Sequence, residues 1–403
     1  MKDRQERFTN HFFIAAALLI CAYIALYGVM GQGVLSHSNY DSYTRQAQGW
    51  WEGRSFLPEN ISWLEIAEYD GHFYVSFPPF PSVVQFLLYP IFGLNTPDNL
   101  VNTLFGLGIF VLVYRYLMRR DFSGLNASLI ALLMTLGSNL FYLSVTGWVW
   151  FSAQTQGFFF SVLAVHLMDK PRRSAWALSF LCLGIAFACR PFNVLYAPLL
   201  LYMLYQQLDD KRGVIRNLAR CVPYVLPLAA MGALAGAYNY SRFGSFLEFG
   251  HNYLPEFQAA EQFSLSYLPT NLLEILKLPG TVPGFWPQFN GTLFFLVNPA
   301  YVLMAVSLIR GRFDVKRLIF VLCLALHFVL TLCHRTMGGW QFGSRYLVDM
   351  LPFMLIVIGD DSVYKARTPV RSARAAILPA LLLVIGAAVN VWGAVWYYTM
   401  PIY

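Results

Sequence analysis

The chain has 403 residues and a formal net charge of +7, and 57% of its residues are hydrophobic while only 12% are charged. Soluble domains carry about 25% charged residues, so this composition excludes an ordinary soluble protein and indicates one polytopic membrane domain, residues 1–403. The basic residues are scattered in small groups between apolar runs, which argues against a nucleic-acid partner. The six cysteines include no CxxC pair and no metal-ligand spacing, so neither disulfides nor a zinc site are predicted.

Eleven apolar runs are long enough to cross a hydrocarbon layer of about 30 Å. In chain order they begin near Phe12, Leu100, Leu125, Trp150, Ala175, Pro191, Val222, Thr292, Leu318, Tyr346 and Ala375. The first is a full span, which predicts a retained anchor and not a cleaved signal peptide. A further apolar stretch, residues 80–94, is short and bracketed by prolines, which favours an interfacial or re-entrant helix.

The basic residues test this assignment. With eleven crossings and a cytoplasmic N-terminus, 21 of the 28 lysines and arginines lie on the inner side, as the positive-inside rule favours. If residues 80–94 crossed fully, every later basic residue would change sides and the bias would be lost. The sequence therefore predicts a multi-pass cell-membrane protein with two long outer loops, residues 31–99 and 241–291.

Both predicted outer loops are rich in Trp, Tyr, Phe and Pro, so we expect them to fold against the membrane surface. An interfacial aromatic belt is the simpler explanation for any single ring. It accounts less well for the dense cluster that includes Trp50 and Trp51.

Seven basic residues remain on the outer side, and six are arginines, whose planar guanidinium suits phosphate or carboxylate. Arg190 lies in the hairpin between the fifth and sixth runs, and Arg345 precedes an outward-to-inward helix. Both arginines are expected at the outer ends of their helices, where their side chains can reach one common point at the outer leaflet of the membrane. The alternative is that each snorkels to the interface or pairs with an acid such as Asp349 or Asp41.

Asp41 follows the first span closely, which holds it near the bilayer surface. A carboxylate beside membrane arginines can act as a general base if a substrate hydroxyl lies within about 3 Å. The N-cap of the helix that follows is an equally good interpretation, because Asp is a favoured cap. Asp70 precedes Gly71 and fits a turn first, and His72 next to it fits a surface histidine.

Four segments in this order resemble a known family. They are NYDSYTRQAQGWWEG, YDGHFYVSFPPFPSVVQFLLYPIFG, CRPFNVLYAPLLL and GGWQFGSRYLVDMLPFML. Together they are similar to the type C membrane glycosyltransferases that use polyprenyl-phosphate sugars. The likeness is to the bacterial group related to protein O-mannosyltransferases and lipid A aminoarabinose transferases.

The resemblance implies an all-α membrane fold of about eleven transmembrane helices, with juxtamembrane helices in two large outer loops. It places Asp41 at the catalytic centre and Arg190 and Arg345 at the donor phosphate. The prolines and glycine of residues 78–93 match the juxtamembrane helix before the second crossing. Asp41 has Tyr40 and Ser42 beside it and no second acid, so no metal and no other cofactor are predicted. The chain stops soon after the last run, so the acceptor is expected to meet the two outer loops or a partner.

The reaction expected from the resemblance moves a sugar from a polyprenyl-phosphate donor to an acceptor hydroxyl on the outer face. The arginines stabilise the departing phosphate, and Asp41 deprotonates the hydroxyl, which attacks with inversion. The predicted substrate-binding residues are Tyr43, Arg45, Trp50, Glu68, Asp70, His72, Arg242 and Trp340. The sugar and the acceptor, which can be a glycan, a lipid or a protein, are left open.

Two other classes remain as alternatives. A transporter or flippase for a lipid or a lipid-linked sugar also places arginines near lipid phosphates, although the sequence shows no convincing internal repeat of the kind such proteins carry. A non-catalytic envelope-assembly protein needs no acid and arginine group at one outer mouth.

Overall fold

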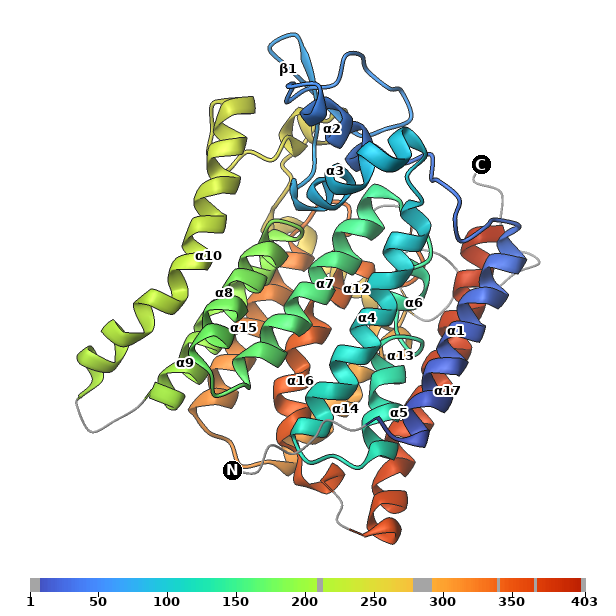
Figure 1. Cartoon of the computed structure of the whole chain (residues 1–403), viewed down its shortest axis with the longest axis vertical. Coiled ribbons are helices and arrows are strands. Elements are labelled where there is room, and N and C mark those ends of the chain that lie inside the picture. The colour runs from blue at the N-terminus through green and yellow to red at the C-terminus, as the bar shows by residue number, and fades with distance from the viewer. Residues whose placement is uncertain (1–7, 209–212, 278–291, 339–340, 366–367, 400–403) are drawn as a thin grey trace.

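The computed structural model describes residues 8–208, 213–277, 292–338, 341–365 and 368–399. Within these residues the protein is mainly helical, and its long helices run side by side along the long axis of a bundle (Figure 1). Smaller elements gather at the upper end of that bundle, where the candidate site lies.

Each of the eleven predicted runs contains helix. The long or central helices are α1 (Asn10–Met30), α4 (Asp98–Arg119), α5 (Gly124–Met134), α7 (Val149–Met168), α8 (Arg173–Phe187), α9 (Ala197–Leu208), α10 (Val214–Phe243), α14 (Ala300–Arg310), α15 (Val315–Leu332), α16 (Leu351–Asp360) and α17 (Pro369–Thr399). In the described part of the chain, five of them, α1, α4, α10, α15 and α17, are long and apolar enough to span a membrane. The predicted number of eleven crossings stays a prediction.

The remaining elements are short. They are α2 (Ser42–Trp51), β1 (Ile66–Tyr69), β2 (His72–Val75), α3 (Phe80–Phe92), η1 (Gly93–Asn95), α6 (Leu140–Leu143), η2 (Pro191–Tyr196), η3 (His251–Tyr253), α11 (Pro255–Gln258), η4 (Leu265–Tyr267), α12 (Leu268–Leu276), α13 (Phe294–Val297), η5 (Arg345–Met350) and η6 (Ser362–Tyr364).

The core and the surface of the bundle are both apolar. Inside, α7 packs against α4, α8 and α16, and rings such as Phe151 and Phe158 are almost completely buried. Outside, large apolar side chains such as Ile24, Leu226 and Ile377 are exposed on α1, α10 and α17. Exposed apolar surface along helices whose backbone bonds are internally satisfied fits a lipid environment, as the composition predicted.

The first predicted outer loop forms α2, a hairpin and α3 at the upper end (Figure 1). Strands β1 and β2 are antiparallel and pair Tyr69 with His72. The turn between them is Asp70–Gly71, and both residues have positive φ, as the predicted turn requires. Helix α3 occupies the stretch predicted not to cross the membrane, and it lies beside α2 at this end.

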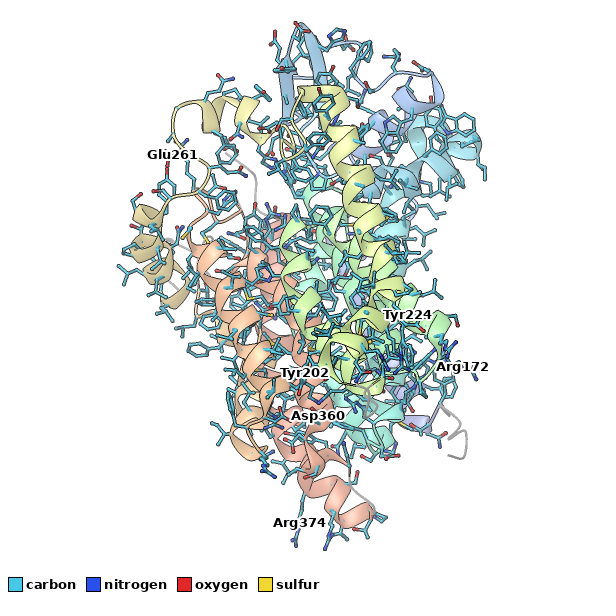
Figure 2. The ribbon with its side chains drawn as sticks, turned by 90° about the vertical axis from the view of Figure 1, so that its left-hand side faces the viewer. Arg172, Tyr202, Tyr224, Glu261, Asp360 and Arg374 are labelled. Atoms are coloured by element: carbon cyan, nitrogen blue, oxygen red, sulfur yellow. The ribbon has the colours of Figure 1, made fainter. Side chains whose placement is uncertain are left out.

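Charged residues form a different arrangement at the lower end. Arg120 contacts Asp360 at 3.1 Å and Asp169 at 3.4 Å, and Lys316 also pairs with Asp360. These pairs join the ends of α4, α7, α15 and α16. Figure 2 shows Arg374 near the lower end of the molecule, with Asp360 and Arg172 also in its lower half, whereas Glu261 lies toward the opposite end.

Candidate active site

Two adjoining cavities lie at the upper end, between α7, η5 and the loop segments. The first has a volume of about 280 Å³ and the second about 260 Å³. The wall that they share is formed by Phe77, Trp150, His251, His334, Arg345 and Tyr346. The two cavities therefore belong to one site with a common cationic and aromatic wall.

Arg345 is a buried cation on that shared wall. Its side chain donates to the carbonyl of Gly338, from Nη2 at 2.8 Å and Nε at 3.2 Å, and from Nη1 to Gln154 Oε1 at 3.3 Å. Gly338 has a φ of 108°, which only glycine adopts easily. Among the residues that the structure describes, no carboxylate lies within ion-pair distance of Arg345. Its positive charge is therefore held in place by neutral oxygens.

Arg190 lies close to the same site as Arg345, in the segment between α8 and η2. Pro191 follows it, and Arg190 has an extended backbone at the N-cap of η2, three residues after α8 ends at Phe187. Its Nε donates to Asp349 Oδ2 at 2.8 Å, an ion pair that the sequence offered as an alternative. The guanidinium carbons of Arg190 and Arg345 lie 4.5 and 4.8 Å from the centre of the Tyr346 ring. Two cations thus meet at one aromatic residue beside one cavity.

Two histidines lie beside these arginines on the shared wall. Burial, with the positive charge of Arg190 as the next cause, lowers the pKa of His251 to about 4. Burial lowers the pKa of His334 to about 3, with further contributions from His251, Arg190 and Arg345. Both imidazoles are therefore neutral near pH 7, and both report a positive local potential.

The second cavity adds two acids, Glu65 and Glu256, to the shared wall. Glu65 directly precedes β1 and is hydrogen-bonded to Trp150. Burial raises the pKa of Glu65, the Trp150 hydrogen bond lowers it, Glu256 raises it, and Arg345 lowers it, with a net increase. Glu256, at the start of α11, is exposed.

Aromatic rings make up most of the rest of the second cavity: Tyr40, Trp148, Phe151, Phe257 and Tyr397. Tyr40 lies 5.0 Å from the ring of Trp148 and 5.0 Å from that of Trp150, measured between ring centres. Because these rings pack against one another, they form a fixed aromatic wall. The first cavity is different, since Phe192, Leu247, Phe249 and Phe263 give it an apolar lining beside Arg190.

Asp41 lies outside both linings. Its Oδ1 accepts from Arg45 Nε at 2.7 Å, and its Oδ2 lies 3.2 Å from His37 Nε2. The residue occupies the N-cap position of α2 without a side-chain cap bond. Burial lowers the pKa of His37, but Asp41 and Asp98 outweigh it and the net pKa is raised, so the cluster is a compact charge network. The structure therefore brings Arg190 and Arg345 together but not Asp41 with them.

All but one of the other residues predicted to bind substrate lie elsewhere in the described chain. Tyr43 is buried against Phe77, and Trp50 donates to Tyr238 at 3.1 Å. Arg242 is buried and donates to the carbonyl of Val75 at 2.9 Å, so it ties α10 to the hairpin. Glu68, Asp70 and His72 lie on the hairpin, and Arg45 pairs with Asp41. None of these four residues lines either cavity. Trp340 lies outside the described residues.

Sequence reasoning did not select Glu65, His251, His334 and Tyr346. Tyr346 had a signal, because it directly follows Arg345. His251 lies in the aromatic segment that opens the second predicted loop. Glu65 and His334 had no signal in the sequence, since their position at the cavity depends on how the two loop regions fold over α7.

Neither a family model nor a curated protein matches the sequence. Solved structures do match. ArnT from Cupriavidus metallidurans in the apo state aligns over 95% of this chain and 75% of its own, with a TM-score of 0.52 and 15% identity. The same protein bound to undecaprenyl phosphate aligns over 95% and 77%, with a TM-score of 0.51 and 13% identity. The Archaeoglobus fulgidus oligosaccharyltransferase in the apo form aligns over 96% and 56%, with a TM-score of 0.53 and 14% identity.

These matched proteins are type C membrane glycosyltransferases, so the overall fold expected from the four sequence segments is confirmed, while its expected number of about eleven transmembrane helices stays a prediction. At 13–15% identity the likeness extends to the fold alone. Functional assignments must therefore come from the site of this chain.

Proposed function

We propose that the chain is an integral membrane glycosyltransferase that transfers a sugar from a polyprenyl-phosphate donor to an acceptor hydroxyl on the outer face of the cell membrane. The observation that carries this proposal is Arg345, a buried guanidinium with no carboxylate within ion-pair distance among the described residues. A buried charge without a counter-ion is costly, so a site that maintains one suits an anionic ligand. A lipid phosphate has this charge and fits the planar guanidinium.

The arrangement around Arg345 suits the departure of a phosphate. When the bond between the sugar and the phosphate breaks, negative charge grows on the phosphate oxygens, and fixed cations in a water-poor site stabilise it. Arg190 supplies the second cation, and the apolar lining of the first cavity suits the start of an isoprenoid tail. The ligand of one fold relative, undecaprenyl phosphate bound to ArnT, belongs to this chemical class.

An acceptor hydroxyl must also lose its proton. Asp41, predicted from the sequence, is one candidate for the base, and the cavity-lining Glu65 is the other. In either case the hydroxyl oxygen attacks the anomeric carbon on the face opposite the phosphate, which inverts the configuration. In this scheme the phosphate charge is stabilised by the guanidinium groups of Arg345 and Arg190.

Binding of undecaprenyl phosphate to the purified protein, followed by native mass spectrometry, tests the proposal. We expect one bound lipid per chain and at least tenfold weaker binding in Arg345→Ala. Arg345→Lys should retain part of the binding, because it keeps the positive charge but lacks the planar guanidinium. Arg172→Ala, in the lower half of the molecule in Figure 2, is the matched control and should bind normally. Equal binding by wild type and both Arg345 variants would remove the phosphate assignment.

Release of free lipid phosphate distinguishes the enzyme from the transporter alternative. An enzyme produces undecaprenyl phosphate from an undecaprenyl-phosphoryl sugar when an envelope extract supplies acceptors, whereas a flippase returns the donor intact. Intact donor moved across a proteoliposome membrane would favour the flippase.

A further inference from the structure

We propose that the second cavity binds the acceptor as a saccharide and that Glu65 takes the proton of its attacking hydroxyl. This inference rests on the proposed glycosyl transfer and specifies the acceptor side of the same site. It assigns the acceptor class that the sequence left open.

The two cavities differ in charge although they share a wall. The first is lined by two arginines, Arg190 and Arg345, and by two acids, Asp349 and Glu248, of which Asp349 is paired with Arg190. The second also has two acids, Glu65 and Glu256, but Arg345 is its one arginine among the described lining residues. With neutral histidines, the arginines and acids balance in the first cavity, whereas the second has one carboxylate in excess, which repels a lipid phosphate at close range. The phosphate therefore belongs in the first cavity, and the second is left for the neutral partner of the reaction.

The walls of the second cavity suit a sugar ring better than a peptide. A pyranose has apolar C–H faces that pack on aromatic rings and a rim of hydroxyls that donate to carboxylates. Packed rings including Tyr40, Trp148 and Trp150 supply the first feature, and the two acids supply the second. A peptide would bring backbone N–H and C=O groups, each of which needs a partner when buried. Walls lined with aromatic rings offer few such hydrogen-bond partners.

Glu65 is the better placed of the two cavity acids to act as the base. Its side chain is partly buried beside Trp150, whereas Glu256 is exposed. Arg345 on the shared wall interacts with Glu65, so the base lies near the group that faces the phosphate. Asp41, by contrast, lines neither cavity and accepts from Arg45 while lying against His37.

The proposed step balances. The acceptor O–H gives its proton to the Glu65 carboxylate, and its oxygen forms the new bond to the anomeric carbon. The bond from that carbon to the phosphate oxygen breaks, and its electron pair leaves with the polyprenyl phosphate. The products are a glycosylated acceptor, a protonated Glu65 and a lipid phosphate, and no other reactant is needed.

Mass analysis of envelope glycans and proteins in the native host tests the inference, because the host contains the true donor and acceptor. The strains are wild type, a deletion of the gene, Glu65→Gln, Asp41→Asn and the control Glu59→Gln, which changes an exposed acid of the same loop. We expect the deletion to remove a sugar that is linked to another sugar, and Glu65→Gln to lose at least 90% of that modification. Glu59→Gln should match wild type.

Membrane abundance and undecaprenyl phosphate binding of each variant separate a lost reaction from lost folding, and Glu65→Gln should keep both. Two results would overturn the inference: the missing sugar is found on protein Ser or Thr, or Glu65→Gln stays active while Asp41→Asn is inactive. If wild type fails to bind undecaprenyl phosphate, the proposed function itself fails, and this inference with it.

Discussion

Asp349 is the residue that limits how much of the Arg190 charge a ligand can use. Its carboxylate accepts from Arg190 Nε at 2.8 Å and from Gln154 Nε2 at 3.2 Å, and it is almost completely buried. A phosphate in the first cavity must compete with this carboxylate for the guanidinium. Asp349 therefore opposes anion binding while it stabilises the empty site.

The substitution Asp349→Asn separates these two effects. It keeps the shape of the side chain and removes the charge, so we expect undecaprenyl phosphate to bind several-fold more tightly. The protein itself should lose about 3 kcal/mol of stability, because breaking a buried ion pair leaves an uncompensated charge. Lipid titration and thermal denaturation measure the two quantities. Weaker lipid binding would instead make Asp349 a residue that positions Arg190.

The neutral histidines provide a second measurement at the same wall. Burial and nearby cations lower the pKa of His251 to about 4 and that of His334 to about 3. A phosphate bound by Arg190 and Arg345 brings negative charge close to both rings, so it should raise both pKa values. Because the bound state then takes up protons more readily, lipid phosphate affinity should increase as the pH falls toward those raised values.

Imidazole NMR titrations with and without undecaprenyl phosphate check this expectation. The uncharged alcohol undecaprenol is the matched control, since it has the same tail and no phosphate, and it should leave both titrations unchanged. Equal shifts with the alcohol would show that tail burial, and not charge, moves the pKa values.

At the scale of the elements, α17 supports the segment that leads into Arg345. Gly393 of α17 lies so close to the Phe342 ring that a Cβ at position 393 would overlap it, and Phe342 is fully buried. Asn390, one turn earlier, donates to the carbonyl of Val297 at 2.8 Å and accepts from Asn139 Nδ2 at 3.2 Å. Close packing and amide hydrogen bonds of this kind are the usual means of holding membrane helices together.

The substitution Gly393→Ala should therefore displace Phe342. We expect a loss of about 1–3 kcal/mol from overpacking, and weaker undecaprenyl phosphate binding, because Phe342 lies three residues before Arg345. Gly232→Ala on α10 is the matched control, since a Cβ there meets no atom within 4 Å. Thermal denaturation and lipid titration of both variants are the measurements. If both behave like wild type, the α17 contact has no role in placing Arg345.

The same elements show how far the sequence could predict the site. Arg190 and Arg345 were expected at one mouth because each lies at the end of an apolar run, and such ends are fixed by length and charge. Asp41 was expected beside them for the same reason, but the local pairing with Arg45 and His37 directs its carboxylate elsewhere. Glu65 reaches the cavity through long-range packing of the hairpin over α7, which periodicity and spacing do not encode.

At the scale of the whole molecule, the two ends of the bundle have opposite chemical character. The upper end has the cavities, the hairpin and α2 and α3, and the lower end has the ion pairs of Arg120, Lys316, Asp169 and Asp360 (Figure 1). The basic residues assigned to the inner side include Arg172 and Arg374, which lie in the lower half in Figure 2. The predicted orientation thus places the proposed site on the outer face, where a lipid-linked sugar would have to be available.

Cysteine labelling in intact cells tests this orientation. Glu261 and Arg374 are both exposed and lie toward opposite ends, so Glu261→Cys and Arg374→Cys report the two sides. With a membrane-impermeant maleimide, we expect Glu261→Cys to react in intact cells and Arg374→Cys to react only after the membrane is opened, because lower-end positive charge favours the cytoplasm. Wild type gives the background from the six native cysteines. The reverse pattern would place the cavities in the cytoplasm and remove the outer-face part of the proposed function, while leaving the lipid phosphate assignment of Arg345 to be judged by its own binding measurement.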